Sequence, residues 1–173
     1  MNDNYDLDKL RKPKRTRINS RTKGNTFERK IAKLLNENFS TDEFSRSPGS
    51  GAFASTHKLP EHLKIFGDLI TPKEFKFCIE CKKGYNKENL YSLYNYSSDL
   101  WEFINQCEKD SQSCDKLPLI IYQQDRQKPL AITRKGTFPD YIQHIDFTNE
   151  EKEKYCMYLL DDLLNLEHYW FFT

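Results

Sequence analysis

The side chains best suited to catalysis lie between Gly67 and Lys83. Residues 75–82 alternate in a pattern typical of a β-strand, so Glu80 and Lys82 should share one face of it. Asp68 opens an earlier short run, and the Pro-Lys-Glu turn between the runs predicts a hairpin that brings Asp68 opposite Glu80. Two carboxylates beside an ammonium group suit the binding of a divalent cation against a phosphate.

A less specific interpretation is open for the same residues. Asp, Glu and Lys are common on protein surfaces, so a Glu-x-Lys triplet alone indicates little. A functional site is favoured because Glu80 and Lys82 end an otherwise apolar strand, where charged groups without a role are uncommon.

The chain before this stretch should contain a helix that begins at an N-cap on Asn25 or Thr26 and ends near Asn38. Its apolar stripe consists of Phe27, Ile31, Leu34 and Leu35. Glu28 borders this stripe and would lean toward whatever the helix packs against. Alternatively, Glu28 completes a capping box with Asn25 and complements the helix dipole.

A loop at residues 47–51, after weak strand character from Phe39, is rich in Ser and Gly. Its backbone N–H groups and hydroxyls could cradle a phosphate, and Arg46 before it favours that interpretation over a plain turn. Residues 52–66 show no clear period and are interpreted as an insertion on the substrate side. Their two histidines are too isolated to predict a metal site.

The stretch 85–96 contains four tyrosines, which could stack on bases, pack against a partner subunit or simply lie on the surface. A helix should follow from a cap at Ser97 or Ser98 to about Asp110. Its inward residues are predicted to be Leu100, Trp101, Ile104 and Cys107.

The C-terminal part should contain two strands, at 117–123 and 129–133. Thr148 and Glu151 have the spacing of a capping box, which predicts a last helix. The apolar stripe of that helix would be Cys156, Leu159, Leu160 and Leu163.

Length and charge limit the classes of protein that this chain can be. A chain of 173 residues is one domain and can bury about 70% of the surface that it exposes when unfolded. The net charge of +1 hides an asymmetry, since residues 9–23 hold eight basic and no acidic residues, whereas residues 140–173 hold eight acidic ones. Residues 1–22 are therefore predicted to be a disordered basic arm that touches phosphate backbones, or a solvated leader without a partner, and 23–173 to be the folded domain.

The five cysteines are an odd number, and the N-terminus has no signal-like apolar run, so free thiols and a cytoplasmic location are expected. Cys78 and Cys81 have the spacing of a zinc site but should point to opposite faces of a strand, so we interpret them as small buried hydrophobes. No apolar stretch approaches membrane-spanning length, and no membrane partner is expected.

Four short motifs occur in order between residues 23 and 83: K-G-x-x-x-E-R (23–29), R-S-P-G-S-G (46–51), G-D (67–68) and I-E-C-K (79–82). Together they resemble the PD-(D/E)XK nuclease superfamily, and within it the archaeal-type Holliday junction resolvases and related small phage endonucleases. A looser similarity continues through Trp101, Gln106, Asp110 and residues 116–122. The segment between Gly51 and Asp68 is longer than in the archaeal pattern and the basic arm is extra, which leaves the substrate open.

The resemblance implies an α/β domain with a mixed central β-sheet flanked by α-helices, as in restriction endonucleases. It implies that Glu28, Asp68 and Glu80 bind Mg²⁺ or Mn²⁺ with the backbone carbonyl of Cys81 as a further ligand. Lys82 would orient or deprotonate the attacking water. The contacts to DNA would come from Arg29, Arg46, Ser47, Ser50 and Lys83, with Gln106 at the site margin.

We therefore expect a homodimeric, metal-dependent endodeoxyribonuclease that cuts branched DNA such as four-way junctions, in recombination or repair, with a phage as one origin. Two alternatives remain open: a nuclease for plain duplex or single-stranded DNA, and a non-catalytic nucleic-acid-binding module. Residues 85–96 and 169–172 are the candidates for the dimer interface, with packing of the C-terminus on its own core as the alternative.

Overall fold

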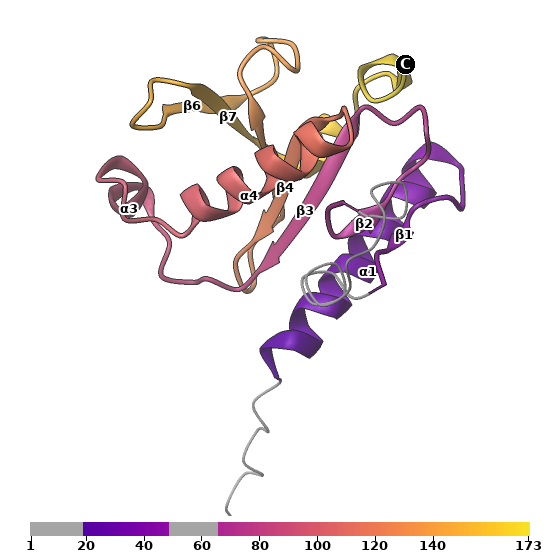
Figure 1. The fold of residues 1–173 in the computed structure, drawn as a ribbon, viewed down its shortest axis with the longest axis horizontal. Helices are drawn as coiled ribbons and strands as arrows, with labels where there is room; N and C mark the ends of the chain where they lie inside the picture. The colour runs from indigo at the N-terminus through magenta and orange to yellow at the C-terminus, as the bar shows by residue number, and fades with distance from the viewer. Residues whose placement is uncertain (1–18, 49–65) are drawn as a thin grey trace, which may run out of the picture.

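A computed structural model describes residues 19–48 and 66–173 of the chain (Figure 1). The helices are α1 (Ser20–Phe39), α3 (Leu90–Tyr94), α4 (Leu100–Ser113), α5 (Leu160–Leu163) and the 3₁₀ turn η3 (His168–Trp170). The strands are β1 (Ser45–Arg46), β2 (Leu69–Ile70), β3 (Phe77–Lys83), β4 (Leu117–Gln123), β5 (Leu130–Arg134), β6 (His144–Thr148) and β7 (Lys154–Leu159). Most of the predicted basic arm, Ser50 and most of the predicted insertion lie outside the described residues.

Five strands form the central sheet in the order β3-β4-β5-β7-β6. β3 and β4 run parallel, and every other neighbouring pair runs antiparallel. This mixed sheet with its flanking helices confirms the predicted α/β fold. β1 and β2 form a separate two-stranded ladder.

The strands β4 and β5 of the central sheet agree closely with the strands predicted from the sequence. The strand predicted at 117–123 is β4, which is buried on both faces except at its first residue. A nearly continuous apolar run is what a strand covered on both faces requires. The strand predicted at 129–133 is β5, displaced by one residue to Leu130–Arg134.

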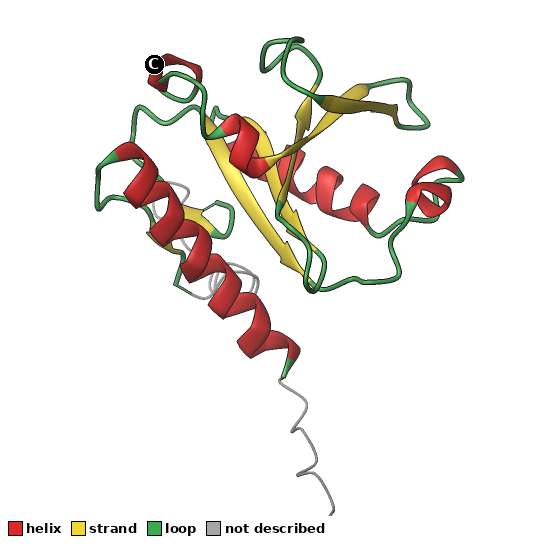
Figure 2. Cartoon of the chain, turned by 180° about the vertical axis from the view of Figure 1, so that it is seen from behind, coloured by secondary structure: helices red, strands yellow, loops and turns green. Residues whose placement is uncertain are grey.

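Two helices cover opposite faces of β3 and β4 (Figures 1 and 2). Against one face, α1 contributes Phe27, Ile31 and Leu35 to a core that includes Ile79 and Ile121. Against the other face, α4 contributes a second group, which packs with Ile120, Tyr122 and Ile132 and consists of Leu100, Phe103, Ile104 and Cys107. Alternate residues of each strand therefore serve the two helices.

The first helix begins earlier than predicted. Its N-cap is Asn19, whose side chain accepts a hydrogen bond from the backbone N–H of Arg21 at 3.0 Å. Residues 20–22, assigned from sequence to the arm, are thus the first helical residues. Glu28 lies in the helix interior and is buried, so the capping-box interpretation with Asn25 is wrong.

The predicted last helix is also wrong. Residues 154–159 form strand β7, and only Leu160–Leu163 are helical. Tyr155 packs in the core under α4, whereas Cys156 and Tyr158 belong to the core under α1. This alternation is that of a strand, and pairing with β5 and β6 on both sides overrides the helix-like spacing of the leucines.

The predicted helix after the tyrosine-rich stretch is α4, with one error in its inward face. Leu100, Ile104 and Cys107 are buried as predicted. Trp101 is only half-buried and packs beside Tyr96, 5.8 Å between ring centroids. Trp101 packs against the margin of the core under α4, and Phe103, which was not predicted to point inward, is buried in that core.

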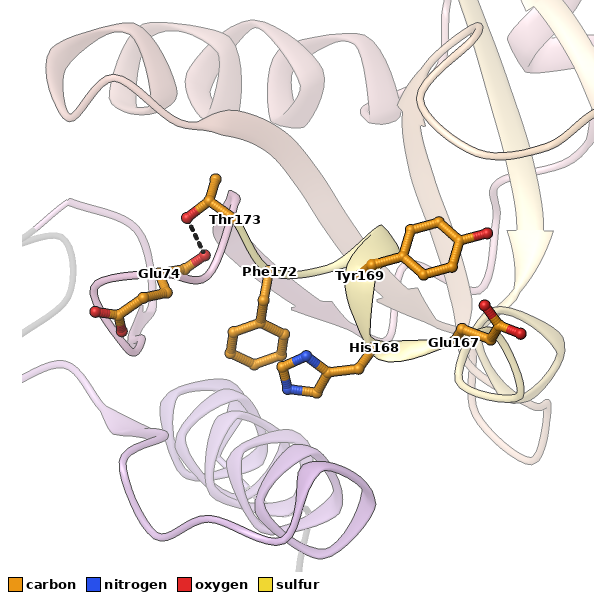
Figure 3. Close-up of a pocket in the computed structure, with 6 residues that line it drawn as sticks. All are labelled: Glu74, Glu167, His168, Tyr169, Phe172 and Thr173. Carbon is orange, nitrogen blue, oxygen red and sulfur yellow. Dashed lines mark hydrogen bonds between the residues drawn. The ribbon is translucent and has the colours of Figure 1, made fainter.

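The C-terminal aromatic segment packs on its own chain. Phe171 is 2% exposed in the core under α1, and His168 stacks on Phe172 with ring centroids 3.9 Å apart. Figure 3 shows this segment beside Glu74, whose carbonyl accepts a hydrogen bond from the Thr173 hydroxyl at 3.2 Å. Intramolecular packing therefore accounts for Phe171 and Phe172, and the pocket drawn there includes no predicted site residue.

Among the residues that the structure describes, no helix is both long enough and apolar enough to span a bilayer.

Candidate active site

Strand β3 holds Glu80 and Lys82 on the face covered by α4. The Lys82 Nζ lies 4.9 Å from the centre of the Phe103 ring and donates to Gln106 Oε1 at 3.4 Å. It also forms an ion pair with Glu80 Oε1. The predicted sharing of one face is therefore confirmed, and α4 supplies the neighbours.

Asp68 lies along the free edge of β3, but not through the predicted hairpin. Its strand neighbour β2 pairs with β1, with Arg46 opposite Leu69. Two hydrogen bonds join Asp68 to β3: its N–H donates to the Ile79 carbonyl at 2.8 Å, and its Oδ2 accepts from the Cys81 N–H at 2.8 Å. The prediction placed Asp68 correctly beside Glu80 and had the wrong pairing partner.

The Cys81 backbone is placed as the predicted ligand set requires. In an extended strand the N–H and C=O of one residue point to the same side. Because the Cys81 N–H binds Asp68 at the free edge of β3, the Cys81 carbonyl points to that edge as well. Its role as a metal ligand stays a prediction.

Gly67 allows Asp68 to approach the strand this closely. Its φ is +73°, and a Cβ at this position would lie 2.6 Å from the Ile79 carbonyl oxygen and 2.9 Å from Cys78 Sγ. No side chain fits there without displacing backbone. The Gly-Asp pair is therefore a steric requirement of the site and not only a sequence motif.

Glu28 reaches the same region from α1. It is 6% exposed, and its Oε2 accepts from Arg46 Nε at 2.5 Å. Arg46 Nη2 also donates to Asn25 Oδ1 at 2.9 Å. The β1–β2 ladder pairs Arg46 with Leu69, the residue after Asp68, and Arg46 fixes the Glu28 carboxylate.

Burial and mutual repulsion make these carboxylates hard to ionise. Burial raises the pKa of Glu80 to about 7, with the Asp68 charge as the next cause and Lys82 opposing both. Burial and Asp68 also raise the pKa of Glu28, against the hydrogen bond from Arg46. A group of buried acids with this bias favours the binding of a cation among them.

Lys82 is held as an ammonium. Burial alone would lower its pKa, but the neighbouring Glu80 carboxylate outweighs it and raises the pKa overall. The Asp68 charge contributes to both raised pKa values, whereas burial raises the pKa of Glu80 and opposes the rise at Lys82.

Asp110 of α4 is a site residue that sequence reasoning named in a motif but gave no role. Burial raises its pKa, while a hydrogen bond from the Gly67 backbone amide opposes that shift. It lies one helical turn after Gln106, so both side chains project from one side of α4 toward the site. The four-residue spacing in a helix was the available signal.

The predicted DNA contacts lie in different environments. Arg29 is exposed on α1 and lines a surface pocket with Lys33 and Arg46. Lys83 is partly buried, with its Nζ 3.3 Å from the Gln124 carbonyl oxygen and 3.9 Å from Asp125 Oδ1. These contacts tie Lys83 to the loop after β4.

The serine-rich loop is described only at its start. Ser47 is 2% exposed and its N–H donates to the Asp68 carbonyl at 2.9 Å. Its hydroxyl is buried without a hydrogen-bond partner among the described residues. Phosphate binding by Ser47 stays a prediction, and Ser50 falls outside the described ranges.

The cysteines near the site are structural. Cys78 and Cys81 are both free and buried, 3% and 6% exposed, as the interpretation of small buried hydrophobes predicted. Cys107 on α4 is buried opposite Cys78, whose carbonyl lies 3.6 Å from the Cys107 sulfur.

Comparison with known proteins agrees with this geometry. The model of the family described as phage putative PDDEXK endonuclease matches residues 19–171. The chain belongs to this family. It is also 32% identical to Protein D14 of Escherichia phage T5 over 115 residues, which cover 63% of this chain and 67% of that protein. No solved structure matches the chain at a significant level.

Membership in the PDDEXK family confirms the resemblance seen in the sequence and supports a nuclease activity. Nucleases of this superfamily typically use divalent metals. The matched range includes α1, β1, β3 and α4 and the segment that carries Asp68, and therefore every described site residue.

Proposed function

We propose that the chain is a metal-dependent DNA endonuclease that hydrolyses phosphodiester bonds in branched DNA. The observation that carries this proposal is Glu80, which is 2% exposed, has a pKa raised to about 7 and stands beside Asp68 and Lys82. A buried carboxylate with so little compensation is costly to a fold unless a bound cation offsets it.

The donor set fits Mg²⁺ or Mn²⁺. Glu28, Asp68, Glu80 and the Cys81 carbonyl would hold the ion, and all of these are hard oxygen donors of the kind that magnesium prefers. When bound, the ion supplies charge stabilisation for the attacked phosphate and a lower pKa for water. Arg46 supports the set by keeping the Glu28 side chain in one orientation.

Lys82 acts on the water or the phosphate from the α4 side. As an ammonium group it can donate a hydrogen bond to either and stabilise negative charge that develops during attack. Glu80 and Gln106 fix its position, so losing Gln106 should misplace Lys82 without removing the charge. Deprotonation of the water by Lys82 would need its pKa to fall after the ion offsets Glu80.

The phosphate backbone would be bound along α1 and the loop after β1. Arg29 is exposed and Arg46 borders the same surface pocket, so DNA lying there would pass close to Glu28. Ser47, Ser50, Lys83 and Gln106 complete the proposed contacts. The basic residues of 9–23 would add affinity that does not depend on sequence.

Branched substrates and a homodimer are the finer part of the proposal. The described residues form one such cluster of carboxylates per chain, whereas resolving a four-way junction takes two symmetric nicks, so two chains are needed. The name of Protein D14 gives no activity, so the similarity to it supports a common origin and says nothing about the substrate.

A second candidate is cleavage of single-stranded DNA. Tyr91 and Tyr94 on α3 are 74% and 83% exposed and could stack on unpaired bases. Duplex DNA offers few free base faces, so these tyrosines would contribute little to binding it.

The test is cleavage of matched four-way junction, flap, duplex and single-stranded DNA, with Mg²⁺, with Mn²⁺ and with chelator. We expect metal-dependent cleavage that is fastest on the junction, by a protein whose light-scattering mass is that of a dimer. Glu80→Gln serves as the inactive control for contaminating nucleases. Metal-dependent cleavage that favours single strands selects the second candidate, and no metal-dependent cleavage of any DNA overturns both.

A further inference from the structure

Three potential metal ligands meet at the other edge of the sheet, away from Glu80. They are His144 and Asp146 of β6 and Cys156 of β7. Asp146 lies directly opposite Cys156 in the strand register, and His144 lies two residues before Asp146 on the same face of β6. One ligand atom of each lies within 4.8 Å of the other two.

The tautomer of His144 follows from its backbone contact. Nδ1 lies 2.6 Å from the carbonyl oxygen of Ile142, and because a carbonyl can only accept, Nδ1 carries a proton. Nε2 then faces Asp146 Oδ1 at 3.2 Å. Two lone pairs would repel at that distance, so a second ring proton or a bound cation must lie between them.

The same contact is the usual support for a histidine that binds a metal. Ligating imidazoles commonly donate their other ring N–H to a backbone carbonyl, which fixes the tautomer and aims the free nitrogen. Packing strengthens the orientation here, because the His144 ring lies 5.4 Å from the Tyr158 ring, centroid to centroid. Neither contact requires the metal to be present.

Asp146 already has one of its two oxygens occupied. Lys135 pairs with Oδ2, whereas Oδ1 accepts from Cys156 Sγ at 3.1 Å and faces His144. A cation at Oδ1 would therefore keep the Lys135 ion pair intact. It would replace only the thiol proton and the proton, if any, on Nε2.

We propose that His144 Nε2, Asp146 Oδ1 and Cys156 Sγ form a zinc site at the β6–β7 edge. Imidazole nitrogen, thiolate sulfur and carboxylate oxygen are the three donor types that zinc takes, and sulfur disfavours magnesium. Zinc is usually four-coordinate, so three protein ligands leave one position for water or another small ligand. Zinc here would tie β6 to β7 independently of the nuclease site.

Cys156 must lose its proton to bind. Burial, and then the Asp146 carboxylate, raise the pKa of this thiol to about 11. Metal coordination deprotonates a thiol outright, so zinc binding should release a proton. The side chain is fully buried whereas Asp146 is about half-exposed, which leaves entry open from the Asp146 side only.

The test is a titration of the full chain with Co²⁺, which occupies zinc sites and gives a thiolate charge-transfer absorption band. We expect one equivalent of Co²⁺ bound with that band, and displacement of the band by one equivalent of Zn²⁺. Ions bound at Glu80 have oxygen donors and give no thiolate band, so the two sites are distinguished in one experiment.

Three variants assign the band. Cys156→Ser should remove it, and His144→Ala should weaken Zn²⁺ binding by at least tenfold. Cys114→Ser, a partly exposed cysteine after α4, should leave both unchanged. Absence of a thiolate band in the unaltered protein, binding only at millimolar Zn²⁺, or a band that survives in Cys156→Ser would overturn the proposal.

Discussion

The two edges of the central sheet carry polar clusters that compensate their charges in opposite ways. At the β3 edge, Glu80 is 2% exposed and Asp68 8% exposed, and the pKa of Glu80 is raised. At the β6 edge, Asp146 is about half-exposed, and hydrogen bonds from Lys135 and then Cys156 lower its pKa. At the β3 edge, Lys82 and Arg46 only partly offset the buried carboxylates of Glu28, Asp68 and Glu80, whereas at the β6 edge Lys135 pairs with the one carboxylate, Asp146.

This difference explains why the two clusters suit different ions. A desolvated group of oxygen donors lowers its own cost by taking up a hard divalent cation. Asp146 is exposed and already paired with Lys135, so its charge alone gives little affinity for a cation. The choice of metal ion at this edge would therefore depend on the nitrogen and sulfur donors beside it. Under the two proposals, a carboxylate would serve as a hard-metal ligand at one edge and as part of a mixed donor set at the other.

The largest expected effect is a difference in DNA cleavage between variants at the β3 edge and variants at the β6 edge. Glu80→Gln should reduce metal-dependent cleavage by more than the roughly 10- to 100-fold lost when a residue that only orients a ligand is changed, because Glu80 is proposed to bind the ion directly. His144→Ala should leave cleavage within about twofold. Single-turnover rates with saturating Mg²⁺ check both, and equal losses in the two variants would contradict the separation of the edges.

DNA binding is the control for that result. Glu80→Gln should bind junction DNA as tightly as the unaltered chain in the presence of Ca²⁺, because the proposed phosphate contacts come from other residues. A variant that also fails to bind would indicate lost folding and not lost chemistry.

The second prediction concerns stability against pH in metal-free buffer. The pKa of Glu80 is raised from 4.5 to about 7, so the folded state holds the proton more tightly than the unfolded state. Its contribution is complete below pH 4.5 and is lost as pH rises through about 7, a change of roughly 3 kcal/mol in the free energy of unfolding. Urea unfolding in EDTA at several pH values measures it.

Glu80→Gln should flatten this pH dependence, since its amide does not titrate. Groups away from the site titrate alike in both proteins, so the difference between the two curves reports residue 80 together with the neighbours coupled to it. Parallel curves would mean that Glu80 is not the group that shifts. Adding Mg²⁺ above pH 7 should restore part of the lost stability to the unaltered chain alone.

The sequence predicted the elements that local patterns determine and missed those that depend on contacts between distant residues. β4 and the shared face of Glu80 and Lys82 were predictable, because local alternation and apolar content settle them. The partner of β2 was not, because its pairing with β1 joins Ser45 to Ile70, residues that lie far apart in the sequence. Sequence spacing alone favoured the nearer strand.

The C-terminal error has a different cause. The leucines at 159, 160 and 163 have helical spacing, but β7 lies between two strands whose hydrogen bonds require an extended chain. The same error explains why the sequence did not point to His144 and Asp146. No strand was expected at these residues, so neither their shared face nor their proximity to Cys156 could be predicted. The sequence shows that these residues are of types that bind metals, but it does not show that β6 and β7 pair and bring them together.

The third prediction tests the close approach at the β3 edge. Gly67→Ala should destabilise the fold by roughly 1–3 kcal/mol and displace Asp68, because its Cβ would meet the Ile79 carbonyl at 2.6 Å. Gly136→Ala is the matched control, with φ +84° and no atom within 4 Å of the added Cβ. Both variants carry the positive-φ strain, so thermal unfolding of the pair measures the contact alone. Equal destabilisation would mean that Asp68 does not need this approach.

The last and smallest effect concerns Asp110, which reaches the Gly67 amide from α4. Asp110→Ala should weaken Mg²⁺ binding and cleavage by about 10-fold, within the range for residues that orient a ligand, because the turn carrying Asp68 loses its anchor. Asp110→Asn keeps an oxygen acceptor for that amide and removes the charge. If the hydrogen bond to Gly67 is what matters, this variant should recover most of the lost Mg²⁺ binding and cleavage. If the negative charge of Asp110 is what matters, it should recover none. Gln112→Ala, exposed on the same helix, should change neither quantity. Calorimetry of Mg²⁺ binding and cleavage rates on one substrate distinguish the outcomes, and an unchanged Asp110→Ala protein would show that β3 alone positions Asp68.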